Sequence, residues 1–472
     1  MRPARLLWTA IAAYAAAFAS LSVLRNRAFQ TGRFDLGNMV QAVWSTAHGR
    51  PLRITDLKGD QISRLAAHVD PILAVFAPLW WLWPSEDMLL VAQAIAVALG
   101  ALPVYWLARE HLDSERAGLG FALAYLLLPA VQWLTLNEFH PVALATPLLL
   151  FAFWYLDEDR LAAFAVCAVL AAACKEEIPL VLAGFGIWYA LARRRPVAGG
   201  AIAAVSLAWA ALAIGFVIPH FNNGASSSFY SRYSEVGGSP RGVLRTAVTH
   251  PWRLVSTAFG HRSVHYLIQL GFPLAVLWAL APLVLVAALP DLTINLLSAA
   301  PTQTSIHFHY TAGIIPPLMI ASVLGAARLC ERVRPATIAA VVVAVALVGN
   351  YRLGAIPLWR ELPGGQSYQA TASRVSSHDR AALRAVRLVP AGAVVSASNS
   401  LGAHLSARRR VLSFPYLEDA TWVAADETVP GYADRLAPIP AATQLAWLRR
   451  NPAWRLVFEQ DGILVFHRIL PP

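Results

Sequence analysis

Charged residues and cysteines are scarce in this sequence. Only 14% of the 472 residues are charged, 57% are hydrophobic, and the mean hydropathy is +0.52. Soluble globular chains carry about 25% charged residues, so this composition argues against a soluble fold. Cys167, Cys174 and Cys330 lie in or beside apolar segments without C-x-x-C spacing. That placement indicates neither a disulfide framework nor a thiolate metal site.

Cations outnumber anions, and the formal net charge is +11. Such an excess can indicate nucleic acid, but a membrane protein also holds cations in its cytoplasmic loops. The arginine clusters here flank apolar segments, as Arg193 to Arg195 does. The sequence therefore predicts the lipid bilayer as a partner, and no nucleic acid.

Long apolar segments fill most of the first 350 residues. A membrane-spanning helix needs about 17 to 25 such residues, and eleven candidates meet or approach that length. The run 267–300 is too long for one crossing, and Pro282 and Pro290 are break points for a hairpin of two spans. The other nine lie near 6–23, 88–108, 117–134, 141–156, 161–174, 178–192, 197–218, 311–328 and 336–350.

The first apolar segment resembles a signal peptide, because it follows Arg2 and Arg5. Leu24 to Arg27 stands where a small-residue cleavage site is needed, so we expect an uncleaved first span. The run from Pro71 to Pro84 is short and rich in tryptophan. Tryptophan is enriched at membrane interfaces, so we expect this run to lie on the membrane surface.

The arginines also set the predicted orientation. With the run from Pro71 to Pro84 on the surface, the span-flanking arginines fall on the cytoplasmic side, as the positive-inside rule requires. The N-terminus is then cytoplasmic, and exterior loops cover 24–87 and 219–266. The polar motifs gather on the outer face of a plasma (inner) membrane, where we expect the active or binding face.

After Asn350 the composition becomes polar. Residues 1–350 are expected to form an all-α polytopic domain of about eleven transmembrane helices. Residues 351–370 are a linker, and residues 371–472 are a small α/β domain outside the cytoplasm. Its expected elements are a helix over 378–388 and strands near 393–397, 454–458 and 462–466, with a solvated turn over 407–410.

Asp35 is the leading candidate for chemistry in the first exterior loop. A carboxylate just outside a bilayer can deprotonate an acceptor hydroxyl or bind a divalent cation. A solvated loop position or a helix N-cap is the structural alternative. His68 and Asp70 follow in the same loop, where a cap before a helix that starts at Pro71 explains them equally well.

Two further motifs separate predicted spans. Glu138 and His140 lie at a membrane boundary, where such groups are costly unless hydrated, paired or used. Lys175, Glu176 and Glu177 interrupt another apolar run. The lysine could neutralise a phosphate, and the glutamates could bind a cation or pair with it. Ordinary interhelical turns are the alternative for both motifs.

A third group precedes a late span and includes His307, His309 and Tyr310. The two histidines share a face on a strand but point apart on a helix, so their spacing does not establish a metal pair. Arg232, in the loop 219–266, runs against the positive-inside bias and could hold an anionic lipid phosphate. A charged, solvated loop is the alternative for Arg232.

The order of these motifs resembles the C-type glycosyltransferase superfamily. Its members are polytopic enzymes that take sugar from a polyprenyl-phosphate donor on the exterior face. Within it, the chain resembles a prokaryotic family of predicted membrane proteins classed as a domain of unknown function, DUF2079. The match covers roughly residues 20–330 and is carried by Phe34-Asp35-Leu36-Gly37-Asn38, His68-Val69-Asp70-Pro71, Glu138-Phe139-His140-Pro141, Lys175-Glu176-Glu177 and His307-Phe308-His309-Tyr310.

The resemblance implies roles for particular residues. Asp35 occupies the position of the catalytic base, and Glu138 or His140 stands near the second acidic motif. Lys175 stands near a lysine that meets the donor phosphate, and His309-Tyr310 near the loop that closes over the lipid head. Two departures are that Leu36 replaces a frequent second acid and that Glu-Phe-His replaces an aspartate motif.

We therefore expect a membrane glycosyltransferase that uses a polyprenyl-phosphate-linked sugar on the extracytoplasmic face. A divalent cation, Mg or Mn, is left open as a cofactor. A lipid or solute transporter or flippase, and a non-catalytic scaffold, are the alternative functions. The catalytic candidates are Asp35, Glu138 and His140, and the substrate-binding candidates are Lys175, Glu176, His68, Asp70, Arg232, His307, His309 and Tyr310.

Overall fold

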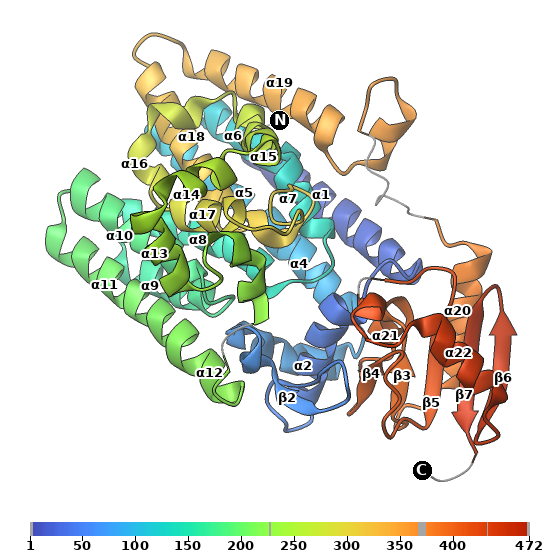
Figure 1. Ribbon diagram of the computed structural model, residues 1–472. Coiled ribbons are helices and arrows are strands. Elements are labelled where there is room, and N and C mark those ends of the chain that lie inside the picture. The colour runs from blue at the N-terminus through green and yellow to red at the C-terminus, as the bar shows by residue number, and fades with distance from the viewer. Residues whose placement is uncertain (1–2, 226–227, 367–373, 432, 470–472) are drawn as a thin grey trace.

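The computed structural model describes residues 3–225, 228–366, 374–431 and 433–469. It is mostly helical and ends in a small sheet domain (Figure 1). The helices of the main body are α1 (Pro3–Arg27), α4 (Asp87–Leu99), α5 (Ala101–His111), α6 (Glu115–Leu127), α7 (Pro129–Leu136), α8 (Pro141–Asp157), α9 (Leu161–Ala172), α10 (Ile178–Ala192), α11 (Pro196–Leu212), α12 (Ile218–Phe221), α13 (Pro240–Thr249), α14 (Pro251–Ala258), α15 (His261–Gly271), α16 (Pro282–Leu285), α17 (Leu289–Leu296), α18 (Ile315–Leu329) and α19 (Pro335–Leu353).

Fewer helices than expected are long enough to cross a membrane. Among the described residues, four pass on length and apolar composition, or five if the bent pair α6 and α7 forms one span. The four are α1, the joined α4 and α5, α11 continued through α12, and α19. Apolar helices such as α8, α9, α10 and α18 have 12 to 17 residues. They are about 18 to 26 Å long, less than a hydrocarbon core of about 30 Å, so the expected eleven spans are not confirmed.

The apolar run 267–300 does not form two continuous helices. After α15 ends, Ala275 and Val276 adopt positive φ angles of 53° and 57°, which no α-helix permits. Pro282 and Pro290 then start the short helices α16 and α17. The prolines mark helix starts, as their missing N–H favours, but the pieces between them are too short to be spans.

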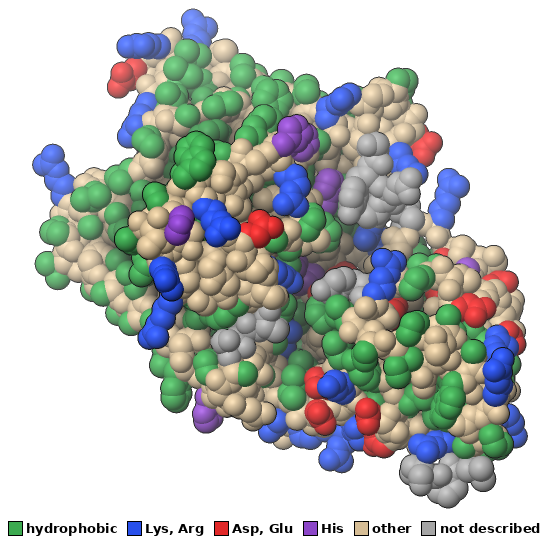
Figure 2. All heavy atoms as spheres, in the orientation of Figure 1, with side chains coloured by type: hydrophobic (Ala, Val, Ile, Leu, Met, Phe, Trp, Pro, Cys, Tyr) green, Lys and Arg blue, Asp and Glu red, His purple; other side chains and the backbone are tan. Residues whose placement is uncertain are grey.

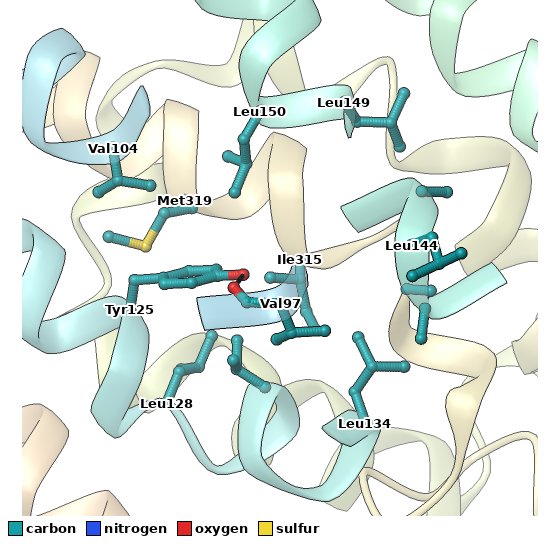
Figure 3. Close-up of a cluster of buried hydrophobic side chains, with 14 of the residues drawn as sticks. Val97, Val104, Tyr125, Leu128, Leu134, Leu144, Leu149, Leu150, Ile315 and Met319 are labelled. Carbon is teal, nitrogen blue, oxygen red and sulfur yellow. Dashed lines mark hydrogen bonds between the residues drawn. The ribbon is translucent and has the colours of Figure 1, made fainter. Parts of the chain in front are cut away.

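A buried apolar cluster joins the helices of the body. Figure 3 shows side chains from α4 to α8 and from α18 meeting around Tyr125, which is fully buried. The phenol donates to the carbonyl oxygen of Val97 at 2.8 Å, so its polar atom is satisfied inside the apolar cluster. This packing makes the ends of these helices a rigid frame for the polar turns that connect them.

The loop 24–87 has its own structure. A π-helical turn, η1 (Arg33–Gly37), leads directly into α2 (Asn38–Ala47). The run from Pro71 to Pro84 forms η3 (Pro71–Phe76) and α3 (Ala77–Leu82). Trp81 and Leu82 are 68% and 82% exposed. The loop also contains α2 (Asn38–Ala47), β1 (Arg53–Thr55), β2 (Gln61–Ser63) and α3 (Ala77–Leu82).

The C-terminal domain is a five-stranded mixed sheet in the order β4-β3-β5-β7-β6. β3 pairs in parallel with β4 and β5, whereas β7 is antiparallel to β5 and β6. Alternate strand residues pack α20 and α21 on one face and α22 on the other, as a period of two requires. The elements are β3 (Val395–Ala397), β4 (Val411–Ser413), β5 (Trp422–Asp426), β6 (Trp454–Gln460), β7 (Ile463–Arg468), α20 (Ser377–Leu388), α21 (Asn399–His404) and α22 (Ala441–Arg450).

The small α/β domain and its helix over 378–388 were thus expected correctly. Part of the predicted linker, 367–370, lies outside the described residues, as do 371–373. Most acidic side chains on the face in Figure 2 belong to this domain, while the helical body shows mainly apolar and neutral surface.

The C-terminal domain docks on the loop 24–87 (Figure 1). Arg410 Nε donates to the carbonyl oxygen of Gly59, and Gln41 Nε2 donates to that of Arg408. Arg408 is only 6% exposed, because its guanidinium donates to the carbonyl oxygens of Leu405, Pro390 and Ala393 within the domain. The expectation of a solvated turn over 407–410 thus holds for the exposed Ala407 and Arg409 but is wrong for the buried Arg408.

Candidate functional site

Asp35 lies in the π-helical turn between α1 and α2. Such turns are rare overall, but many of those known lie at functional sites, because they redirect a side chain out of the helical pattern. The Asp35 side chain is 45% exposed, whereas its neighbours Arg33 and Leu36 are buried. The turn thus presents one carboxylate to solvent from an otherwise packed segment.

His140 faces that carboxylate. Its Nε2 lies 3.5 Å from Asp35 Oδ1, and its Nδ1 donates to the carbonyl oxygen of Asn137 at 2.7 Å. Partial burial raises the pKa of Asp35, but His140, with Arg64 and Arg232, outweighs it and lowers the pKa below its ordinary value.

Glu138 accepts two backbone hydrogen bonds from the same turn. Its Oε2 accepts the backbone N–H groups of Gly32 at 3.0 Å and Leu36 at 2.9 Å. Burial, together with the charge of Asp35, raises the pKa of Glu138 to about 8. The pKa values of the two carboxyl groups therefore differ, so that Asp35 is ionised and Glu138 holds its proton near neutral pH.

The loop carrying Glu138 and His140 is itself fixed. Glu138 has a positive φ of 52°, a strained conformation that surrounding contacts must hold in place. Gln93 of α4 supplies them, because its amide donates to the carbonyl of Glu138 and accepts the N–H of His140. Sequence reasoning missed Gln93, although a buried amide within an apolar span is a recognisable signal.

His309 extends the site beyond His140. Their rings stack with centroids 3.8 Å apart, and Asn137 Oδ1 accepts the backbone N–H of His309 at 3.0 Å. Burial and the neighbouring cationic groups lower the pKa of His309 well below its ordinary value, so its ring is neutral. Tyr310 follows, with its ring 4.2 Å from that of His309.

Two cations converge on Tyr310. Arg232 Nη1 donates to its hydroxyl at 3.1 Å, and Lys175 Nζ lies 5.7 Å from the ring centroid. Lys175 also pairs with Glu177 Oε1 at 2.6 Å. Burial lowers the pKa of Lys175, but the charges of Glu177 and Glu176 outweigh it and raise the pKa, so the lysine remains charged. Positive charge therefore lies beside the Asp35 and His140 pair.

Glu176 connects this region to the loop 24–87. It accepts from His68 Nδ1 at 2.8 Å and from the backbone N–H of Val69 at 3.0 Å. Burial raises the pKa of Glu176, but His68 and Lys175 outweigh it and lower the pKa to about 2. His68 stacks on Phe229, over which the Arg232 guanidinium lies at 4.7 Å.

Two predicted residues take other positions. Asp70 is buried and pairs with Arg64 through one oxygen, Oδ2, which lies 2.9 Å from Arg64 Nε and 2.8 Å from Nη2. The ring of His307 packs edge-on against Trp133, 4.8 Å between centroids, and burial lowers its pKa to about 4. The remaining predicted residues form one continuous cluster.

The cluster also bears on the expected divalent cation. Within the described part of the chain, no group of three or more His, Cys, Asp or Glu side chains could hold a metal ion. Glu176 and Glu177 have His68 and Lys175 as partners instead. The carboxylate geometry therefore does not fit a three-ligand site, and Mg or Mn remains a prediction.

Comparison with solved structures shows the fold. The chain is similar to ArnT from Cupriavidus metallidurans bound to undecaprenyl phosphate, with a TM-score of 0.53 at 13% identity over 97% of each chain. The apo state of ArnT gives 0.53 at 14% identity over 96% of each chain. The comparison with curated proteins finds no match.

The family comparison covers nearly the whole chain. Residues 25–465 match the model described as "Predicted membrane protein (DUF2079)". That range includes the turn bearing Asp35, every other member of the polar cluster and most of the docked C-terminal domain. The resemblance expected from the motifs is thereby confirmed, and the chain belongs to the DUF2079 family of predicted membrane proteins.

Proposed function

We propose that this protein is a membrane glycosyltransferase that takes a sugar from a polyprenyl-phosphate donor on the extracytoplasmic face. The observation that carries the proposal is the Asp35 and His140 pair, which lies beside the cations Lys175 and Arg232. A base next to an anion site is the arrangement that this transfer needs. The fold shared with ArnT, whose structure has undecaprenyl phosphate bound, agrees with it.

In the proposed reaction, Asp35 acts as general base. It takes the proton of an acceptor hydroxyl, whose oxygen then forms a bond to the anomeric carbon of the donor sugar. The bond between that carbon and the phosphate oxygen breaks, its electron pair leaves with the polyprenyl phosphate, and configuration inverts. The low pKa of Asp35 keeps it ionised and ready to accept the proton.

The leaving phosphate carries the negative charge that develops. Lys175 and Arg232 approach the same Tyr310 side chain, so both can reach one phosphate group. A charged donor bonded to a phosphate is stronger than a neutral one, and a site that excludes water strengthens it further. Glu177 pairs with Lys175 and keeps the ammonium group in position.

Binding of undecaprenyl phosphate to the full chain in lipid nanodiscs tests the anion site. Lys175→Gln is expected to weaken binding about 10-fold or more, because it removes a buried charge from the phosphate. Asp35→Asn is expected to leave binding near the wild-type value. Lys58→Ala and Asp60→Asn are matched controls, since both side chains are exposed.

Transfer of labelled sugar from a panel of polyprenyl-phosphate sugars tests the base. Asp35→Asn is expected to reduce transfer about 100-fold or more, while Asp60→Asn retains it. Full transfer by Asp35→Asn would remove Asp35 from this role. If the wild type bound no polyprenyl phosphate and transferred no sugar, a transporter or scaffold would explain the fold better.

A further inference from the structure

The turn that carries Asp35 is completed by the other end of the chain. Phe34, which precedes Asp35, donates its backbone N–H to Asn399 Oδ1 at 3.0 Å. Asn399 is the first residue of α21 in the C-terminal domain and is 365 positions away in sequence. This domain therefore contributes a side chain to the backbone beside the candidate base.

The start of a helix leaves backbone N–H groups without partners in the helix. In this turn Glu138 accepts the N–H groups of Gly32 and Leu36, and Asn399 accepts the N–H of Phe34. The acceptors come from opposite sides, Glu138 from the helical body and Asn399 from the C-terminal domain. Both are needed if the buried donors of the turn are to be satisfied.

The amide of Asn399 has little freedom to move. Its own backbone N–H donates to Asp434 Oδ1 at 2.7 Å, and Asp434 Oδ2 accepts the N–H of Gly431 at 2.6 Å. A Cβ at Gly431 would lie 2.8 Å from Asn399 Cβ, and one at Gly32 would lie 2.4 Å from Asn399 Nδ2. Glycine at both positions leaves the space that the amide fills.

Arg33 also binds the turn to the C-terminal domain. Its fully buried guanidinium donates to the carbonyl oxygen of Val411 and to Ser413 Oγ at 2.8 Å, both on β4. The docked domain therefore holds two successive residues of the turn, Arg33 by its side chain and Phe34 by its backbone. The next residue is Asp35, whose carboxylate points to His140.

We propose that Asn399 is a positioning residue, which fixes the Phe34 peptide and thereby holds the Asp35 carboxylate against His140. The inference rests on the proposed function, because it takes Asp35 as the base. It makes the C-terminal domain a part of the active site. Loss of the hydrogen bond from Phe34 to Asn399 releases the turn on the side of the C-terminal domain, and the carboxylate loses its fixed direction.

Three variants of the full chain in nanodiscs test this role. Asn399→Leu removes the acceptor at similar volume, and Asn399→Asp keeps an acceptor oxygen. Gly32→Ala displaces the amide from the opposite side, and its φ of −120° is open to alanine. Asn451→Leu is the control, because Asn451 Oδ1 accepts the N–H of Ala453 in the same domain, away from the turn.

The kinetic readout separates positioning from binding. Asn399→Leu and Gly32→Ala are expected to lower kcat about 10- to 100-fold with KM for the donor little changed. Asn399→Asp should recover most of kcat, and Asn451→Leu should match the wild type. Wild-type kcat in both Asn399→Leu and Gly32→Ala would overturn the proposal.

A second readout needs no substrate. Infrared titration follows the protonated carboxyl band of Asp35, assigned by its loss in Asp35→Asn. The groups that face this carboxylate are His140, Arg64 and Arg232, which favour its ionised form, and Glu138, which opposes it. Release of the turn moves Asp35 from His140, so the band should titrate at higher pH in Asn399→Leu and Gly32→Ala.

An unchanged band in both variants would overturn the positioning role, even if one of them lost stability. The infrared result also separates this proposal from the proposed function. A wild type that transfers no sugar would contradict the function, while its Asp35 band would still show whether Asn399 fixes the carboxylate.

Discussion

Arg33 shows how much one buried side chain can hold. Its guanidinium is a planar fork of donors, each of its three nitrogens donates to a protein acceptor, and burial lowers its pKa to about 10 without discharging it at neutral pH. Its acceptors come from one segment of the loop 24–87 and from the C-terminal domain. They are the carbonyl oxygens of Val411, Thr55 and Asp56, and Ser413 Oγ.

We expect Arg33→Lys to lower the thermal unfolding midpoint, since an ammonium group cannot reach all these acceptors. Two buried acceptors left without donors cost about 2 to 5 kcal/mol. Differential scanning fluorimetry in detergent measures the change. Arg53→Lys, at an exposed position of β1, is the matched control. Equal midpoints for Arg33→Lys and Arg53→Lys would contradict this account.

Glu138 provides a pH prediction. Its folded-state pKa of about 8 lies above the ordinary value of 4.5, so the folded state binds the proton more tightly than the unfolded state. Its contribution to stability is fully present below about pH 4.5 and is lost as pH rises through about 8. Glu138→Gln keeps an acceptor oxygen for Gly32 and Leu36 but cannot ionise.

The unfolding midpoint of Glu138→Gln should therefore fall less steeply between pH 5 and 9 than that of the wild type. Parallel curves for the two proteins would show that Glu138 does not hold a proton in this range. Glu115→Gln controls for the loss of a carboxylate at the exposed start of α6.

At the scale of elements, α20 is joined to the sheet by His378. Its Nε2 lies 3.0 Å from Asp426 Oδ2 on β5, and its Nδ1 lies 2.9 Å from the carbonyl oxygen of Asp461. Burial lowers the pKa of His378, but Asp426 and the Asp461 carbonyl outweigh it and raise the pKa above 6.5. The stabilisation is full below pH 6.5 and is lost as pH rises through the folded-state value.

Amide hydrogen exchange of α20 should thus quicken, beyond its intrinsic base dependence, as pH rises from 6 to 8. His378→Gln should remove most of this extra dependence. His467→Gln, on β7 of the same domain, is the control. If α20 in His378→Gln kept the wild-type pH dependence, the joint would not depend on the charge of His378.

Elements that depend on local pattern could be predicted. The helix expected over 378–388 is α20 (Ser377–Leu388), with the capping box of Ser376 and Asp379 at its start. The strand expected near 462–466 is β7 (Ile463–Arg468). The prediction of two spans over 267–300 was not confirmed, because hydropathy indicates a buried segment but not the positive φ angles that interrupt it.

The candidate site was accessible to sequence reasoning for a different reason. Polar residues at the ends of successive apolar helices must meet if those ends lie on one face, and Asp35, His140, Lys175 and His309 do so. Asn399 could not be found in this way. In a sequence, an asparagine at the start of a short helix indicates a local cap. The side chain of Asn399 instead accepts the N–H of Phe34, which is 365 residues away.

Across the whole molecule, the C-terminal domain and the helical body unfold as one unit if the interface is strong enough. His404 contributes by facing Glu86 Oε1 at 2.9 Å and the carbonyl oxygen of Asn26 at 3.0 Å, beside the start of α4 and the end of α1. Arg33 and Asn399 hold the same domain to the adjacent turn.

We expect a single unfolding transition for the wild type by both tryptophan fluorescence and circular dichroism. The double variant Arg33→Lys with His404→Ala should separate it into two, the C-terminal domain melting first. The variant Arg53→Lys with His467→Ala is the control. One coincident transition in the interface variant would show that the two parts are coupled by other contacts.

The long sequence separation between Asn399 and Phe34 has a consequence for how the protein is made. The helices can insert one after another as the ribosome supplies them, but the turn with Asp35 waits for the last fifth of the chain to be synthesised and folded. A ribosome that stops early would leave an inserted protein without the hydrogen bond from Phe34 to Asn399. Under the proposed function, newly made copies would acquire activity only after the final residues have been synthesised and folded, which couples the onset of catalysis to the completion of synthesis.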